Sequence, residues 1–192
     1  MCGSTLLAMP RVRVLLVAFL AIVAAACSTA CGGKESGNDR GDVAAATWAE
    51  RVCGALGPWR GEIDALMARA QQRMDRAANA DQAKTGLLEL LGGAEQASEQ
   101  ARAKVAAAGL PDAANGKRAA AEFADTLRRT RDAYGKAKET VDDLPTVDPK
   151  AFYDAVGAAF GQLDKDYGEV NLDRVNSPEL RKAFDEVPAC RS

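Results

Sequence analysis

The feature that most constrains this chain is an apolar stripe between residues 120 and 141, whose members recur at alternating steps of three and four residues. This spacing keeps one face of an α-helix apolar along its whole length, and it is typical of a helix packed against others in a bundle. The sequence therefore predicts a long helix here, buried along one face. The stripe consists of Ala120, Phe123, Leu127, Thr130, Tyr134, Ala137 and Val141.

Other segments carry the same helical pattern. The first begins at residue 45 and contains Gly57-Pro58, where proline removes a backbone hydrogen bond, so we expect a kink or a restart. The second covers residues 81 to 108. A fourth helix should begin at Asp148-Pro149 and a short fifth at Ser177-Pro178, because a capping side chain followed by proline is a common helix start. The expected inner face of the fourth helix comprises Phe152, Val156, Phe160, Leu163 and Tyr167.

These helices predict an all-α fold. Helices of matched length joined by short connections favour an up-down four-helix bundle, with a kinked first helix and a short C-terminal fifth helix. The fifth helix would complete the layer that the fourth begins, and it would lie beside the first. We place this helical bundle domain at residues 45–192, a length sufficient for one hydrophobic core.

The N-terminal segment has the layout of an export signal. Arg11 and Arg13 precede an apolar run of 13 residues, positions 14 to 26, which ends in three alanines. A helix that spans a bilayer needs about 20 apolar residues, so this run is too short for a permanent anchor. We therefore expect residues 1–26 to be a signal peptide that is removed. The polar segment 27–44 has almost no large apolar side chains and is expected to be a flexible tether.

Small residues directly before a cysteine resemble the lipobox of bacterial lipoproteins. Here the sequence Val-Ala-Ala-Ala at positions 23 to 26 precedes Cys27. The resemblance implies that Cys27 receives a diacylglyceryl group and becomes the first residue, which would place the protein on the outer face of the cytoplasmic membrane. Cys31 is the alternative, because cleavage there would leave no odd cysteine, but the residues before it are more polar.

Two further cysteines, Cys53 and Cys190, lie in the expected first helix and after the expected fifth helix. Outside the cytoplasm a disulfide between them can persist, and it would join the two ends of the domain. The alternative is a pair of unrelated thiols, one buried and one in a frayed tail. With Trp48 and Val52, these cysteines resemble the Trp-x3-Val-Cys opening and lone terminal cysteine of small secreted actinobacterial lipoproteins of unknown function, which implies no activity.

The composition limits the chemistry that the chain can perform. It contains no histidine, which excludes Ser-His-Asp and Cys-His nucleophile systems and metal or haem sites built on imidazole. With 25 basic and 27 acidic residues the net charge is −2, which disfavours nucleic acid as a partner. We therefore expect a non-enzymatic protein without a metal ion or cofactor. Trp48 and Trp59 are expected in the core, although Gly57-Pro58 between them could open a hydrophobic groove.

The densest basic cluster, Arg128, Arg129 and Arg131, lies on the third predicted helix. We expect these side chains to face acidic residues of the fourth helix, such as Asp154 and Asp166. Contact with anionic lipid headgroups is the functional alternative for this surface.

Two function classes remain open. The favoured one is a lipid-anchored module that binds another envelope protein or the cell wall. The alternative is a carrier or sensor that binds a small apolar ligand in the bundle core, which requires an internal pocket of several hundred Å³. The many alanines on the expected inner faces predict close helix packing and little void, and they favour the interaction module.

Overall fold

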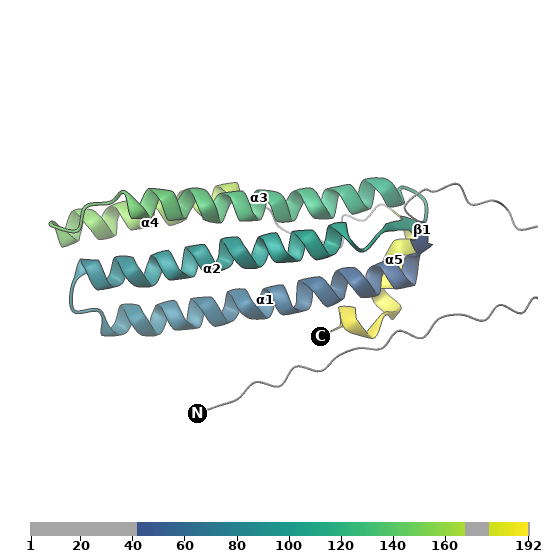
Figure 1. Cartoon of the computed structure of the whole chain (residues 1–192), viewed down its shortest axis with the longest axis horizontal. Helices are drawn as coiled ribbons and strands as arrows, with labels where there is room; N and C mark the ends of the chain where they lie inside the picture. Colours follow the sequence, from purple (N-terminus) through teal and green to yellow (C-terminus); the bar gives the residue numbers. More distant parts are fainter. Residues whose placement is uncertain (1–41, 168–176, 192) are drawn as a thin grey trace, which may run out of the picture. The chain divides into compact units, whose positions relative to one another are not determined.

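The computed structural model describes residues 42–167 and 177–191, and within them the fold is an all-α bundle, as predicted (Figure 1). The predicted signal peptide, Cys27 and Cys31 lie outside the described residues. No helix in the described ranges is long and apolar enough to cross a membrane. The elements are β1 (Asp42–Ala44), α1 (Ala45–Arg76), α2 (Ala80–Ala106), β2 (Leu110–Asp112), α3 (Gly116–Asp142), α4 (Pro149–Asp166), α5 (Pro178–Glu186) and the short 3-10 helix η2 (Pro188–Cys190).

Helices that follow one another in sequence also pack against one another. α2 lies between α1 and α3, and α4 packs on α3, with the chain reversing direction at each connection (Figure 1). The short elements α5 and η2 pack on α1, as predicted for the fifth helix. The position beside α1 is thus taken by α5, whereas α4 contacts α3 extensively and α2 only lightly.

The helix starts follow the capping signals of the sequence. The carboxylate of Asp148 accepts a hydrogen bond from the backbone N–H of Ala151 at 3.2 Å, and the hydroxyl of Ser177 accepts one from Leu180 at 3.3 Å. Both caps satisfy backbone donors that a helix leaves without an intrahelical partner. The predicted starts at Pro149 and Pro178 are confirmed.

Helix α1 runs through Pro58 as one helix, so the restart that we considered at Gly57-Pro58 is wrong. Pro58 lies on the exposed side of α1, four residues after Gly54. The carbonyl of Gly54, which loses its intrahelical partner to proline, is therefore on the solvent side, where water can satisfy it. The interruption that proline imposes is tolerated because it falls away from the core.

Strands β1 and β2 were not predicted. They pair in parallel, with Val43 opposite Pro111, and Val43 packs against the core. The predicted tether therefore extends too far, because residues 42–44 belong to the folded domain and the boundary at residue 45 is three residues late. Three-residue strands carry too little alternation to be recognised from a sequence.

The turn between β2 and α3 depends on two backbone features. Asn115 has φ of 60°, in the left-handed region that asparagine adopts readily. Gly109, which lies before β2 in the connection from α2, also has a positive φ, of 90°. Gly116, the first residue of α3, approaches so closely that an added Cβ would lie 2.0 Å from the carbonyl oxygen of Pro111. Only glycine fits at this position without moving the backbone.

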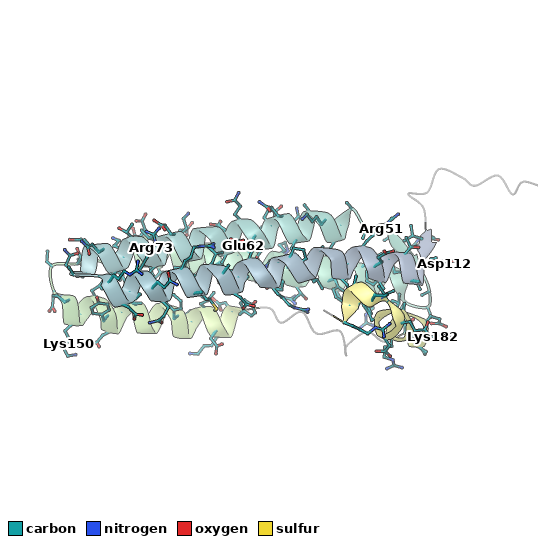
Figure 2. The ribbon with its side chains drawn as sticks, turned by 90° about the horizontal axis from the view of Figure 1, so that it is seen from below. Arg51, Glu62, Arg73, Asp112, Lys150 and Lys182 are labelled. Carbon is teal, nitrogen blue, oxygen red and sulfur yellow. A yellow bond between two sulfur atoms is a disulfide. The ribbon has the colours of Figure 1, made fainter. Side chains whose placement is uncertain are left out.

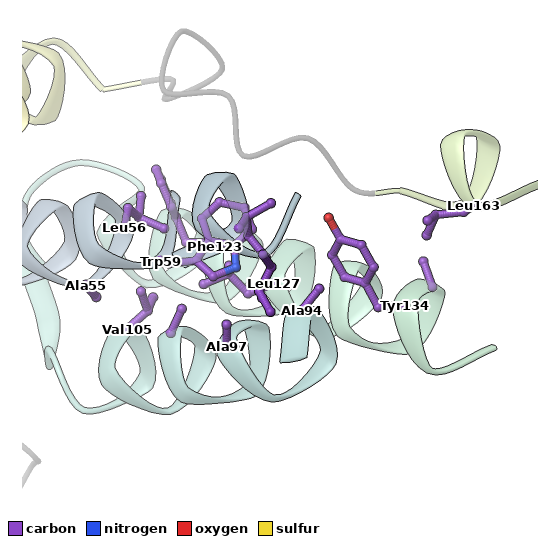
Figure 3. Packing of buried hydrophobic residues seen from close by; sticks show 14 of the residues in the cluster. Ala55, Leu56, Trp59, Ala94, Ala97, Val105, Phe123, Leu127, Tyr134 and Leu163 are labelled. Atoms are coloured by element: carbon purple, nitrogen blue, oxygen red, sulfur yellow. The ribbon is translucent and has the colours of Figure 1, made fainter. Parts of the chain in front are cut away.

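The core combines one aromatic cluster with an alanine-rich helix interface (Figure 3). Trp48 is fully buried, and its ring meets those of Phe123 and Phe184 edge-on at 5.6 and 5.8 Å between centroids. Between α1 and α2 the Leu66 side chain occupies the space beside Gly93, since a Cβ added to Gly93 would lie 2.5 Å from Leu66 Cδ2. The buried alanines of α2, which packs against both α1 and α3, are Ala80, Ala83, Ala94, Ala97 and Ala101.

Candidate functional site

The predicted disulfide is confirmed: Cys53 and Cys190 are bonded, with their Cα atoms 5.0 Å apart. Cys53 is buried on α1, and Cys190 ends η2. The bond holds the last described segment of the chain against α1, next to the aromatic cluster that Phe184 of α5 completes. It joins residues 137 positions apart in sequence, and so ties the two ends of the domain together.

The basic cluster of α3 pairs with different residues from those predicted. Arg128 contacts Asp125 at 2.5 Å and Asp132 at 3.3 Å, and Arg129 also pairs with Asp125. These partners stand three or four residues away on the same helix, a spacing that places side chains on one face. The expectation that the cluster faces α4 is therefore wrong for these arginines.

Arg131 links α3 to α2 instead. It contacts Glu99 at 2.7 Å and Asp132 at 2.5 Å, and Glu99 also holds Arg102 at 2.6 Å. The hydrogen bonds from Arg102 and Arg131 lower the pKa of the Glu99 carboxyl from 4.5 to about 2. Because acidic side chains balance the arginines, the cluster offers little uncompensated charge to an anionic surface.

The lowered pKa of Glu99 predicts a defined acid sensitivity. A carboxyl with a lower pKa in the folded state stabilises the fold above its unfolded pKa, and this contribution is lost as the pH falls. We expect stability to decrease between about pH 4.5 and pH 2, and Glu99→Gln to remove part of this decrease. Urea unfolding at a series of pH values, with Glu89→Gln as an exposed ion-pair control, measures the effect. Identical pH profiles for the wild type and Glu99→Gln would contradict it.

A groove of about 340 Å³ lies between α1 and α2. Its lining includes Pro58 and Trp59 of α1, so a groove does lie beside Pro58, but its rim is polar and it is not the hydrophobic groove that was considered at Gly57-Pro58. The indole N–H of Trp59 donates to the Ser98 hydroxyl at 3.1 Å, and that hydroxyl donates to the carbonyl of Ala94 at 2.8 Å. Trp59 is thus held in place by a buried hydrogen bond between the two helices that form the groove.

The α2 rim of this groove carries three polar side chains at steps of four residues, Gln96, Gln100 and Lys104. All three are exposed, and none makes a hydrogen bond or ion pair within residues 42–167 and 177–191. On the α1 rim Glu62 pairs with Arg69 at 2.8 Å, and Figure 2 shows Glu62 near the middle of α1. This row was not predicted from the sequence, although its four-residue spacing is a signal that the sequence carries.

A second groove, of about 290 Å³, lies between α3 and α4. Its polar lining is internally paired, because Asp166 accepts hydrogen bonds from Lys136 and Gln162, each at 2.8 Å. Its floor is formed mostly by small or apolar side chains, among them Ala133, Ala137, Leu144, Ala159 and Leu163. The two grooves therefore differ in chemistry. The α1–α2 groove presents carboxamides that have no partner among the described residues, whereas the α3–α4 groove has an apolar floor and polar side chains that bond to one another.

In the part of the chain that the structure describes, no group of three or more histidine, cysteine, aspartate or glutamate side chains is placed to hold a metal ion. Within the described residues, the fold and these sites define a class of protein: an all-α bundle with a disulfide between its two ends and with solvent-open grooves between α1 and α2 and between α3 and α4. No family model matches the chain, and no curated protein or solved structure matches it either. Function must therefore be argued from the site alone.

Proposed function

We propose that this protein is a lipid-anchored, extracytoplasmic and non-enzymatic module that binds another envelope component through its bundle surface. Lipidation at Cys27 would anchor the chain to the outer face of the cytoplasmic membrane. The segment between Cys27 and β1 would connect that anchor to the domain. The α1–α2 groove is the part of the described surface best suited to a partner, because Gln96, Gln100 and Lys104 on its α2 rim make no hydrogen bond or ion pair with the described residues.

The observation that carries the proposal is the disulfide between Cys53 and Cys190. Disulfides of this kind persist in oxidising compartments and are rare in the reducing cytoplasm. An exported chain is also what the apolar run ending at Cys27 favours, so two independent features of the molecule support the same compartment. The non-enzymatic reading is supported by the absence of histidine and by groove rims built of glutamine, lysine and paired carboxylates.

Replacing Cys27 by alanine tests the proposal. In cells fed an alkyne-tagged fatty acid, we expect the wild-type protein to take up the tag and to sediment with membranes, and Cys27→Ala to lose both properties. Cys31→Ala is the matched control and should keep both. Tagging that survives in Cys27→Ala but disappears in Cys31→Ala would move the anchor to Cys31. A wild-type protein that takes up no tag would refute the anchor.

The second candidate function is a carrier of a small apolar ligand. The α3–α4 groove favours it, because its volume of about 290 Å³ approaches that of small-molecule sites and its floor is apolar. Native mass spectrometry of protein purified from its host distinguishes the two. A small-molecule adduct that is lost in Ala159→Phe, a substitution that fills the groove, would favour the carrier.

A further inference from the structure

We propose that the α1–α2 groove binds an extended peptide that carries a carboxylate, with Gln96 and Gln100 pairing with its backbone and Lys104 with the carboxylate. This inference rests on the proposed function and specifies its partner. It begins from the contrast between the two grooves: the rim of the α3–α4 groove is closed by its own hydrogen bonds, whereas Gln96, Gln100 and Lys104 have no protein partner in the described residues.

The spacing of the rim fits an extended chain. Residues four apart in an α-helix are separated by about 6 Å along the axis. Two residues of an extended strand advance about 6.6 Å, so alternate peptide groups of such a chain recur at nearly the interval of Gln96, Gln100 and Lys104. Each glutamine carboxamide offers donors and an acceptor, which is what a peptide group requires.

The floor of the groove suits the side chains of such a peptide. Ala55, Ala97 and Ala101 are small and buried, so they leave room between the helices. Pro58 is the exposed apolar residue of the α1 side, whereas the Trp59 ring is largely buried. The Trp59 ring keeps its place without a ligand, because its N–H is bonded to Ser98 at 3.1 Å. The position of Trp59 is therefore set before a ligand binds, and the ordering cost of binding falls on the exposed side chains of Gln96, Gln100 and Lys104.

Charge sets the direction of the peptide. Lys104 stands at one end of the rim without an ion-pair partner in the described ranges, and Glu62 lines the opposite rim. Arg51 does not line the groove, because its guanidinium donates to the carbonyl of Ala108, just beyond the end of α2, at 3.0 Å. Figure 2 shows Arg51 on the part of α1 nearer its N-terminus than Glu62. A carboxylate at the Lys104 end is therefore complementary to the groove.

An affinity selection tests the proposal on the full chain with its disulfide intact. The probe is a mixture of acetylated pentapeptides with randomised side chains, prepared with a free C-terminal carboxylate or as the C-terminal amide. Peptides retained after equilibrium dialysis are measured by mass spectrometry. We expect retention by the wild type and a loss of about tenfold or more in the variant Gln96→Ala/Gln100→Ala/Lys104→Ala, which removes several hydrogen bonds. Alanine is a good helix former, so these exposed substitutions preserve α2.

The controls separate the sources of binding. Lys136→Ala/Gln162→Ala, which alters the other groove, should retain peptides as the wild type does. Lys104→Ala alone should abolish the preference for peptides with a C-terminal carboxylate over peptides with a C-terminal amide. Retention of amide peptides that are rich in aspartate or glutamate shows whether a side-chain carboxylate is sufficient for binding. Equal retention by the wild type and the triple variant, retention by neither, or retention of chitotetraose in place of peptides would overturn the proposal. These outcomes leave acylation at Cys27 untouched, so they do not bear on the anchor.

Discussion

Reduction of the Cys53–Cys190 disulfide is expected to lower the free energy of unfolding by about 3 to 5 kcal/mol. The bond closes a loop with a sequence separation of 137, and a cross-link of that length removes many conformations from the unfolded chain. For a domain of this size the loss corresponds to a fall in melting temperature of about 10 °C. Thermal unfolding followed by circular dichroism, with and without a thiol reductant, measures it.

The double variant Cys53→Ala/Cys190→Ala separates loss of the bond from other effects of the reductant. It should unfold near the temperature of the reduced wild type and should not respond to reductant. Hydrogen exchange adds a local readout, because α5 has nine residues and is held mainly by α1 and the bond, so its amides should lose protection before those of α2. Reactive thiols at both Cys53 and Cys190 in the exported protein, or an unchanged melting temperature on reduction, would contradict the expected result.

The heptad stripe of α3 shows what the sequence could predict. All seven of its members are buried, including the polar Thr130, because a 3-4 repeat assigns a face without any knowledge of the partner helix. The start of α4 and that of α5 were equally readable, since a cap and the proline after it act within one turn. Local signals of this kind do not depend on how the helices are arranged.

The face of α4 shows where such reasoning fails. Phe152 and Leu163 are buried as predicted, but Val156, Phe160 and Tyr167 are only half-buried. The periodic pattern identifies a wide apolar stripe, yet the depth of burial depends on how many neighbours surround the helix. Because α4 packs mainly on α3, with Ala159 buried in that interface, part of its stripe faces no close helix among the described elements.

The candidate site was only partly readable for a related reason. Gly57-Pro58 did indicate a groove, but the polar side chains on its rim were not predicted. The charge partners of Arg128 and Arg129 were also available locally, since Asp125 stands three and four residues before them. What the sequence lacked was the register between α1 and α2, which determines that Gln96 and Gln100 line the same groove as Trp59.

The largest effect of a single substitution is expected at Trp48. Its side chain is fully buried and contacts both Phe123 and Phe184, so Trp48→Ala should cost about 3 to 5 kcal/mol of stability. The indole N–H of Trp48 has no hydrogen-bond partner among the described residues, although it is buried. A buried donor without a partner is unfavourable by about 1 to 3 kcal/mol, and a phenylalanine at this position would remove that penalty.

Trp59 provides the matched comparison, because it is also largely buried but its N–H is bonded to Ser98 at 3.1 Å. Trp48→Phe loses ring volume but also loses the unpaired donor, so we expect a destabilisation below about 1 kcal/mol. Trp59→Phe loses ring volume together with a buried hydrogen bond, and should cost about 2 kcal/mol. Urea unfolding followed by circular dichroism, which does not depend on tryptophan fluorescence, ranks the two. A larger loss for Trp48→Phe than for Trp59→Phe would mean that the indole of Trp48 stabilises the aromatic cluster through its N–H, with a neighbouring ring face as the acceptor.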